Sequence, residues 1–231
     1  MSTPRPVLID FFALSGTGKS THSNALAEHL TAEGYKAEIL SFTVRRKGKK
    51  GSFGKLQRPP SSIFLKAARM GWGFSRLSSA KSSITRPFRL MKWSYRLLVY
   101  DNMVRSHASE DLDFVILDPS LSSKLKKLYR YFDDSSFVEV ISILEENKLT
   151  SDIVVVIEAD LAMVKERRIA RGSPESVKGD GATISVKKAF SEMEQRDTSI
   201  HFERVGYDSF SSLEGNIRQI ADRCIEVRSQ L

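Results

Sequence analysis

A short glycine-rich segment, SGTGKST at positions 15–21, holds the residues with the clearest chemistry in this sequence. It follows the apolar run PVLIDFFAL (6–14) and precedes a helical period. Backbone N–H groups of such a turn can form a nest for anions, and the following helix adds the positive end of its dipole. Lys19 could bridge the β- and γ-phosphates of a nucleotide, and the Ser20 hydroxyl could bind Mg²⁺. The segment predicts a phosphate-binding loop with Ser15, Gly16, Thr17, Gly18, Lys19, Ser20 and Thr21 as cofactor-binding residues.

A carboxylate at the end of another apolar run could hold the metal. Asp118 ends DFVILD (113–118), the place where an acidic residue holds Mg²⁺ in phosphoryl-transfer sites. An Asp before Pro119 is also an ordinary turn former. Because the same chain contains the phosphate-binding segment, we predict that Asp118 and Ser20 are the metal-binding pair.

An arginine-bearing helix and a glycine-containing segment follow a later apolar run. Arg167, Arg168 and Arg171 lie in one helical period, and we expect at least one of them to be catalytic. Arg167 and Arg171 are chosen because they are four residues apart, so they share a face and could clamp the oxygens of a migrating phosphoryl group. A solvated charged face is the alternative. The segment GSPESVKGDGAT (172–183) is predicted to be a lid that closes over the nucleotide and excludes water. The predicted catalytic residues are therefore Lys19, Asp118, Arg167 and Arg171.

Apolar runs alternate with helical periods along the chain, and this pattern predicts the scaffold. The predicted strands are 6–14, 37–42, 113–118, 152–158 and 201–207. The predicted helices cover 24–30, 122–131, 137–147, 161–171, 183–196 and 212–227. We expect one α/β domain with three layers, a five-stranded, mostly parallel sheet between helices and a helical lid, which binds ligands at the carboxyl ends of its strands.

The positive charge of the chain is concentrated in one segment. The segment 44–107 contains 16 Lys or Arg and one acid, Asp101, whereas the whole chain has 36 Lys or Arg and 28 acids, a net charge of +8. The remaining residues therefore carry 20 basic and 27 acidic side chains. The part 44–60 is predicted to be a loop, and two helices with apolar faces are expected to follow it, the second at 86–107. Such a segment suits phosphates on small molecules, nucleic acid or anionic lipid.

In its phosphate-binding loop and in the order of its later segments, the chain resembles the thymidylate kinase-like branch of nucleoside monophosphate kinases. DFVILDPSLSS (113–123) is similar to that family's third strand and the residues after it. LTSDIVVVIEADLAMVKERRIARG (149–172) is similar to its fourth strand and arginine-bearing helix. RVGYDSFSSLEGNIRQI (204–220) is similar to its last strand, adenine-side turn and closing helix, which adds Asp208 to the cofactor-binding residues. The resemblance implies ATP and Mg²⁺ as cofactors and a P-loop kinase fold.

Several positions depart from that family. Ala13 replaces a loop glycine, and Ser15 stands where a carboxylate or arginine serves the acceptor nucleotide. Phe12 replaces the strand glutamate, and Pro119 replaces the arginine after Asp118. The ATP-side features are kept and the acceptor-side features are replaced, which argues against thymidine monophosphate as the acceptor. The acceptor-binding candidates, taken from the basic segment and from the helix where the family keeps a phosphate-binding arginine, are Arg45, Arg46, Phe88, Trp93 and Arg96.

We therefore predict an ATP-dependent phosphotransferase whose first acceptor candidate is a nucleoside monophosphate. One alternative is a kinase of another phosphorylated or hydroxyl-bearing metabolite held at an anionic membrane, with the face of Ile63, Met70 and Phe74 in the lipid interface. A nucleotide-binding protein with impaired turnover is the other. The single cysteine, Cys224, is expected to be buried, no stretch is apolar enough to span a membrane, and a cytoplasmic location is expected. No specific nucleic-acid partner is expected, and a homodimer is left open.

Overall fold

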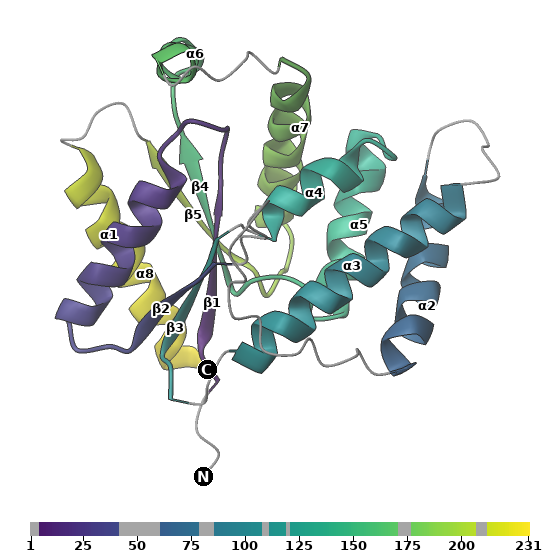
Figure 1. Cartoon of the computed structure of the whole chain (residues 1–231), viewed down its shortest axis with the longest axis horizontal. Helices are drawn as coiled ribbons and strands as arrows, with labels where there is room; N and C mark the ends of the chain where they lie inside the picture. Colours follow the sequence, from purple (N-terminus) through teal and green to yellow (C-terminus); the bar gives the residue numbers. More distant parts are fainter. Residues whose placement is uncertain are drawn as a thin grey trace, which may run out of the picture.

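Five parallel strands form the centre of the protein in the spatial order β2-β3-β1-β4-β5 (Figure 1). They are β1 (Val7–Phe12), β2 (Ala37–Ser41), β3 (Phe114–Asp118), β4 (Ile153–Glu158) and β5 (His201–Gly206). The computed structural model describes residues 5–41, 61–78, 86–107, 111–118, 121–170, 177–206 and 212–231. Every apolar run predicted to be a strand forms one, and all pairs are parallel, so the predicted fold class is confirmed.

Helices cover both faces of this sheet. They are α1 (Lys19–Ala32), α2 (Ser61–Leu77), α3 (Arg86–His107), α4 (Ser122–Tyr129), α5 (Asp134–Glu146), α6 (Leu161–Ala170), α7 (Val177–Glu194) and α8 (Leu213–Gln230). Helices α1 and α8 pack together on one face, and α2, α3, α4, α5 and α7 lie on the other, while α6 follows the carboxyl end of β4 (Figure 1). Helix α7 begins before Thr183, so residues 177–183 of the predicted lid are helical, and residues 172–176 lie outside the described ranges.

Strand β1 shows why its sequence is almost continuously apolar. Val7, Ile9 and Phe11 belong to the core under α1 and α8, which also contains Cys224. Leu8 and Phe12 belong to the core on the opposite face, because successive side chains of a strand point to opposite sides. Both faces of a central parallel strand are buried, so both sets must be apolar. Asp10 is the exception, and it is buried on the same side as Leu8 and Phe12.

Helices α2 and α3 approach each other so closely that one position accepts only glycine. A Cβ atom added to Gly71 would lie 2.6 Å from Cα and 2.8 Å from the backbone nitrogen of Met91. By helix propensity alone, Gly71 and Gly73 would weaken α2. The structure gives Gly71 a packing role, and Gly73 lies at ordinary contact distance, 3.8 Å, from Ile143 Cδ1.

Gly71→Ala is expected to lower the free energy of unfolding by about 1–3 kcal/mol, because the two helix backbones must separate to admit a methyl group. Gly73→Ala is the matched control, in the same helix with the same added group. It should be neutral or stabilising by up to about 1 kcal/mol, because alanine favours a helix over glycine and the added methyl group meets Ile143 at ordinary contact distance. Urea unfolding of both variants tests the pair. Equal effects of the two substitutions would contradict the close-approach argument.

The apolar face predicted to meet a membrane is part of the core. Ile63, Met70 and Phe74 are all buried and belong to the cluster between α2, α3 and the sheet. The prediction that these side chains enter a lipid interface is therefore wrong. Helical spacing identified an apolar face correctly, but it could not show that α3 and α5 cover that face.

Candidate functional site

The segment 15–21 forms a tight turn between the end of β1 and the start of α1. Gly16 and Gly18 have φ values of 93° and 86°, in the left-handed region that side chains disfavour. Thr17 is buried, and its hydroxyl donates to the carbonyl of Leu14 at 2.9 Å. The turn therefore lies at the carboxyl edge of the central strand and leads directly into the first turn of α1. This arrangement favours binding of phosphate oxygens by backbone N–H groups.

Lys19, the first residue of α1, folds back over this turn. Its Nζ donates to the carbonyls of Leu14 at 2.9 Å and Ala13 at 3.3 Å. Burial lowers the pKa of Lys19, and the charge of Asp118 opposes that shift. The ammonium group is thus held in a partly desolvated place beside the loop, where its attraction for an anion is stronger than at an exposed surface.

The Ser20 hydroxyl and the Asp118 carboxylate face each other. Ser20 Oγ lies 3.5 Å from Asp118 Oδ2, and Asp118 is the last residue of β3, next to β1 in the sheet. A hydroxyl and a carboxylate are oxygen ligands of the kind that Mg²⁺ takes from a protein when substrate phosphates and water supply the rest. The pair predicted from sequence is therefore brought together, and its donor set fits the metal. Within the described ranges, no group of three or more His, Cys, Asp or Glu side chains could hold a metal ion.

Arg168, which the sequence prediction did not choose, contacts the loop directly. It is only 8% exposed, and its Nε donates to the carbonyl of Ser15 at 2.8 Å. Its Cγ lies 3.4 Å from the place a Cβ of Gly16 would occupy, so the loop and the arginine fit closely. The charge of Arg168 also helps to lower the pKa of Lys19, after burial. Helix α6 therefore supplies a cation to the phosphate-binding turn.

Two lysines from α4 approach the same region. Lys126 Nζ donates to the carbonyl of Ala13 at 2.8 Å and lies 4.9 Å from the ring centre of Phe12. Lys124 Nζ lies 3.3 Å from the ring centre of Tyr100 on α3, and burial lowers its pKa to about 8, with the charge of Asp10 opposing that shift. The sequence prediction named neither lysine, because only the fold places α4 beside β1.

Asp10 holds α4 in this position. Its Oδ2 accepts from the backbone nitrogen of Ser122 at 2.7 Å and from the Ser122 hydroxyl at 2.6 Å. Leu121, which precedes the helix, provides no capping hydrogen bond of its own. A buried carboxylate in the central strand thus caps a helix that is distant in sequence. Asp10 is a positioning residue for Lys124 and Lys126.

Lys187 of α7 is another cation that the sequence prediction did not include. Its Nζ donates to the carbonyl of Ile157, near the end of β4, at 3.1 Å. Burial lowers the pKa of Lys187, and the positive charge of Lys187 in turn lowers the pKa of Lys19. Cations from α1, α4, α6 and α7 therefore converge at the carboxyl edge of the sheet.

The remaining predicted residues lie elsewhere or outside the described ranges. Arg167 is half-buried on α6, one position from the arginine that contacts the loop. Trp93 and Arg96 line a separate cavity of about 370 Å³ between α3 and the end of α4, and Phe88 is 67% exposed. No contact recorded for the described residues joins these three side chains to the loop. The placements of Arg45, Arg46, Arg171 and Asp208 lie outside the described ranges.

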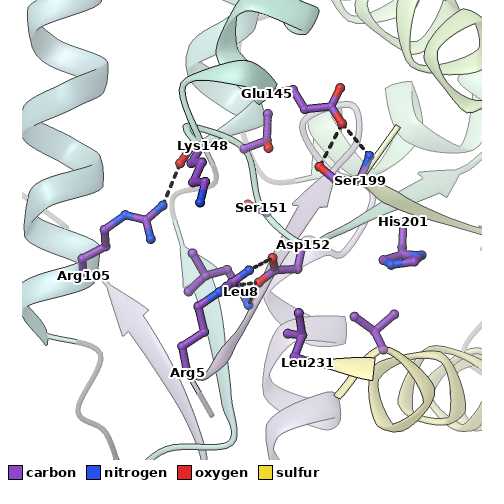
Figure 2. A pocket seen from close by; sticks show the side chains of 12 residues that line it. Arg5, Leu8, Arg105, Glu145, Lys148, Ser151, Asp152, Ser199, His201 and Leu231 are labelled. Carbon is purple, nitrogen blue, oxygen red and sulfur yellow. Dashed lines mark hydrogen bonds and ion pairs between the residues drawn. The ribbon is translucent and has the colours of Figure 1, made fainter. Parts of the chain in front are cut away.

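Another cavity, of about 260 Å³, lies at the opposite, amino-terminal edge of the sheet (Figure 2). Figure 2 shows that Arg5, Arg105 and Glu145 point to partners within its own wall. Arg5 binds both carboxylate oxygens of Asp152 at 2.7 and 2.8 Å, and Arg105 donates to the carbonyl of Lys148 at 2.6 Å. Ligands of open parallel sheets bind at the carboxyl ends of the strands. We therefore regard this cavity as structural and place the candidate site at the loop 15–21.

No family model matches the sequence, and no curated protein matches it. Among solved structures, thymidylate kinase from Candida albicans is 17% identical, with a TM-score of 0.46, over 98% of this chain and 92% of that chain. Deoxyadenosine kinase from M. mycoides with bound dCTP is 19% identical, with a TM-score of 0.44, over 95% of this chain and 99% of that chain.

The same M. mycoides kinase with the products dCMP and dCDP is 18% identical, with a TM-score of 0.45 and the same coverage. These solved structures are nucleoside and nucleotide kinases, the broad class that the sequence resemblance named. At this level of identity the likeness concerns the path of the chain, and no residue takes its role from it. No helix in the described ranges is long and apolar enough to cross a membrane.

Proposed function

We propose that the protein is an ATP-dependent phosphotransferase that moves the γ-phosphoryl group of Mg-ATP to a small acceptor, with a nucleoside monophosphate as the first candidate. The observation that carries the proposal is the turn 15–21, which has two glycines at positive φ and lies between the central strand and a helix. Lys19 and the Ser20–Asp118 pair stand beside it. Together they offer backbone donors, a cation and a metal-binding pair at the edge of the sheet where ligands bind.

The residues of the site would act by positioning and by charge. Backbone N–H groups of the turn would hold the phosphates, and Lys19 would neutralise charge on the β- and γ-oxygens. Ser20 and Asp118 would hold Mg²⁺, which supplies further neutralisation of the phosphate oxygens when bound. Arg168, fixed against the carbonyl of Ser15, would stabilise the charge that develops during transfer.

The positions of Lys124 and Lys126 on α4 favour an acceptor that carries a phosphate group. Lys126 lies over Phe12, the last residue of β1, and Lys124 lies over Tyr100 within reach of the charge of Asp10, both on the side of the sheet opposite α1. A phosphate-bearing acceptor gains from several cations near the donor. Arg45, Arg46, Phe88, Trp93 and Arg96 stay predictions as further acceptor contacts, as do Arg171 for transfer and Asp208 for the adenine side. A homodimer and a peripheral contact with an anionic membrane are further proposals for the partners of the protein.

A screen of phosphoryl transfer tests the proposal. The protein, Mg²⁺ and ATP labelled in the γ-phosphate are combined with nucleoside monophosphates, nucleosides, sugars or isoprenoid alcohols, and labelled acceptor is measured. We expect transfer to at least one nucleoside monophosphate. Transfer only to an acceptor of another class would favour the kinase of a different metabolite. ATP binding without transfer to any acceptor would favour a nucleotide-binding protein with impaired turnover.

The kcat/KM for a phosphate-bearing acceptor should fall as pH rises through about 8, because Lys124 loses its proton near that pH in the free enzyme. An unshifted lysine, with a pKa of 10.5, would stay charged over this range. Lys124→Arg should move the fall to higher pH, because a guanidinium remains protonated. Lys127→Arg, on the exposed side of the same helix, is the control and should leave the profile unchanged. A wild-type profile that is flat to about pH 9.5, or one unaltered by Lys124→Arg, would rule out this role.

A further inference from the structure

Helix α2 has a second apolar face, distinct from the one it buries. Phe64 and Leu65 are each 59% exposed and Trp72 is 61% exposed, and their spacing of seven and eight residues puts them on one side of the helix. The buried face, with Ile63, Met70 and Phe74, points toward α3 and α5. A helix packed on its domain by one apolar face does not need the other for folding.

The neighbouring helix α3 extends this exposed surface. Phe88 is 67% exposed and Met91 is 38% exposed. The ring of Phe64 stacks on Tyr95 with centroids 4.9 Å apart, and Gly71, next to Trp72, touches Met91. These contacts join the two helices, so the exposed side chains form one surface, which we call the α2–α3 patch. Its members are Phe64, Leu65, Trp72, Phe88 and Met91.

Both helices that form the α2–α3 patch contain cations, and no acid occurs within the patch. Helix α2 contains Lys66, Arg69 and Arg76, and the sequences 61–78 and 86–100 contain no Asp or Glu. Lys92 lies one helical turn from Phe88 and therefore shares its face. The helix pair stands at one end of the molecule, away from α1 and α8 (Figure 1).

A cationic cavity adjoins the patch. It has a volume of about 370 Å³, and all the charged groups that line it are basic. Arg96 lies over the ring of Trp93, and Arg130 lies over that of Tyr131, each with 5.1 Å from Cζ to the ring centre. We call it the α3–α4 pocket; its lining residues are Arg89, Lys92, Trp93, Arg96, Arg130 and Tyr131.

We propose that the α2–α3 patch docks on an anionic lipid membrane and that the α3–α4 pocket binds a lipid headgroup phosphate there. Aliphatic Leu65 and Met91 favour hydrocarbon over nucleic-acid bases, and tryptophan is typical of the boundary between headgroups and acyl chains. The cations match the negative surface of such a membrane, and no acid in these stretches opposes the contact. Under this proposal Phe88 contacts lipid, and Trp93 and Arg96 line the headgroup pocket, which is the alternative to the acceptor contacts predicted for these three residues.

This membrane contact differs from the one that the sequence indicated. There the face of Ile63, Met70 and Phe74 was expected to enter the lipid, and that face is buried. The proposal also goes beyond the proposed kinase function and does not depend on it. A vesicle-binding measurement needs neither ATP nor an acceptor, so failure of either proposal leaves the other open to its own test.

Co-sedimentation of the full chain with lipid vesicles provides the test. One set of vesicles contains phosphatidylcholine alone, and the other also contains phosphatidylserine. We expect binding to the anionic set only, weakening as sodium chloride is added. Trp72→Ala and Leu65→Asp should each weaken this binding about tenfold, and Arg89→Glu with Lys92→Glu should do the same.

Control variants show whether a loss of vesicle binding comes from the patch and the pocket or from a general change in charge or polarity. Ile184→Asp changes an apolar side chain on α7 that is 53% exposed, outside the patch. Lys36→Glu with Arg218→Glu makes the same change in net charge on the opposite side of the sheet. These controls should bind the anionic vesicles like the unchanged protein. Thermal melting of each variant shows whether it is folded.

Several outcomes would overturn the proposal. Absence of binding to anionic vesicles at low salt would do so, and so would equal weakening by the patch variants and their controls. Binding that is lost with the cations but unchanged by Trp72→Ala and Leu65→Asp would show surface adsorption without insertion. Binding of a single-stranded oligonucleotide in place of vesicles, or dimerisation lost on Trp72→Ala, would assign the patch to nucleic acid or to a second copy of the chain.

Discussion

Replacing Lys19 with alanine is expected to lower kcat with Mg-ATP by about 10²–10⁴. Charge-assisted contacts are worth about 1.5–3 kcal/mol each, and Lys19 would make two of them to the β- and γ-phosphates. Because each 1.36 kcal/mol is tenfold in rate, their combined loss of about 3–6 kcal/mol gives this range. These contacts strengthen as charge moves toward the leaving oxygen, so the loss should be larger in kcat than in ATP affinity. Steady-state kinetics with the best acceptor measures both quantities.

The same substitution should leave the fold intact. Burial lowers the pKa of Lys19, because desolvation disfavours the charged form of the side chain before a nucleotide binds. Removing the ammonium group therefore costs little stability, and the melting temperature of Lys19→Ala should equal or exceed that of the unchanged protein. Lys36→Ala, at an exposed position, is the control for loss of one positive charge. Turnover by a folded Lys19→Ala protein at the unchanged rate would contradict the role of the loop in transfer.

The inner strands β1, β3 and β4 could be predicted because they are buried on both faces, whereas the edge strands β2 and β5 are partly exposed and have weaker apolar runs. A parallel strand between two layers of helices must be apolar throughout, so runs such as DIVVVIE are distinct from the amphipathic periods around them. The order of the strands in the sheet could not be predicted in this way. Nothing local in β1 indicates that β3 and β4 are its two neighbours, yet this pairing brings Asp118 beside Ser20.

Local sequence patterns did not identify which arginine of α6 contacts the loop. The spacing of Arg167 and Arg171 predicted a shared face, but spacing does not say which face of α6 meets the loop. Val164 is buried and lies four residues before Arg168, so the inward face of α6 contains Arg168. The apolar residue one turn earlier was the signal in the sequence that could have identified this arginine.

Lys126 and Asp10 could not be found from the sequence in the same way. Their partners, the carbonyl of Ala13 and the backbone nitrogen of Ser122, are more than a hundred residues away along the chain. A buried acid within an apolar strand was a visible anomaly, because an unpaired charge in a core is costly. It indicated that some donor must lie opposite Asp10. Only the fold identifies that donor as the start of α4.

Replacing Arg168 with alanine is expected to lower kcat by about 10³, at the lower end of what an arginine supplies to a transferring phosphoryl group. Its Nε is fixed on the carbonyl of Ser15, and its charge lies near Lys19, where negative charge would develop during transfer. A group that is already positioned stabilises that charge without reorganisation. The KM for ATP should change less than kcat, because the interaction is stronger in the transition state than in the ground state.

Arg168 also packs against the loop, so its variant needs readouts that separate catalysis from structure. Arg168→Lys keeps a positive charge but not the planar guanidinium, and it should recover only part of the lost kcat. Arg167→Ala and Arg171→Ala, predicted from the sequence to lower kcat as well, are measured beside it, with the melting temperature of every variant. A large loss in kcat for Arg168→Ala at an unchanged melting temperature supports its direct role in transfer. If Arg168→Ala only melts earlier while Arg167→Ala and Arg171→Ala lose kcat, the catalytic cations are Arg167 and Arg171, and Arg168 is a structural support for the loop.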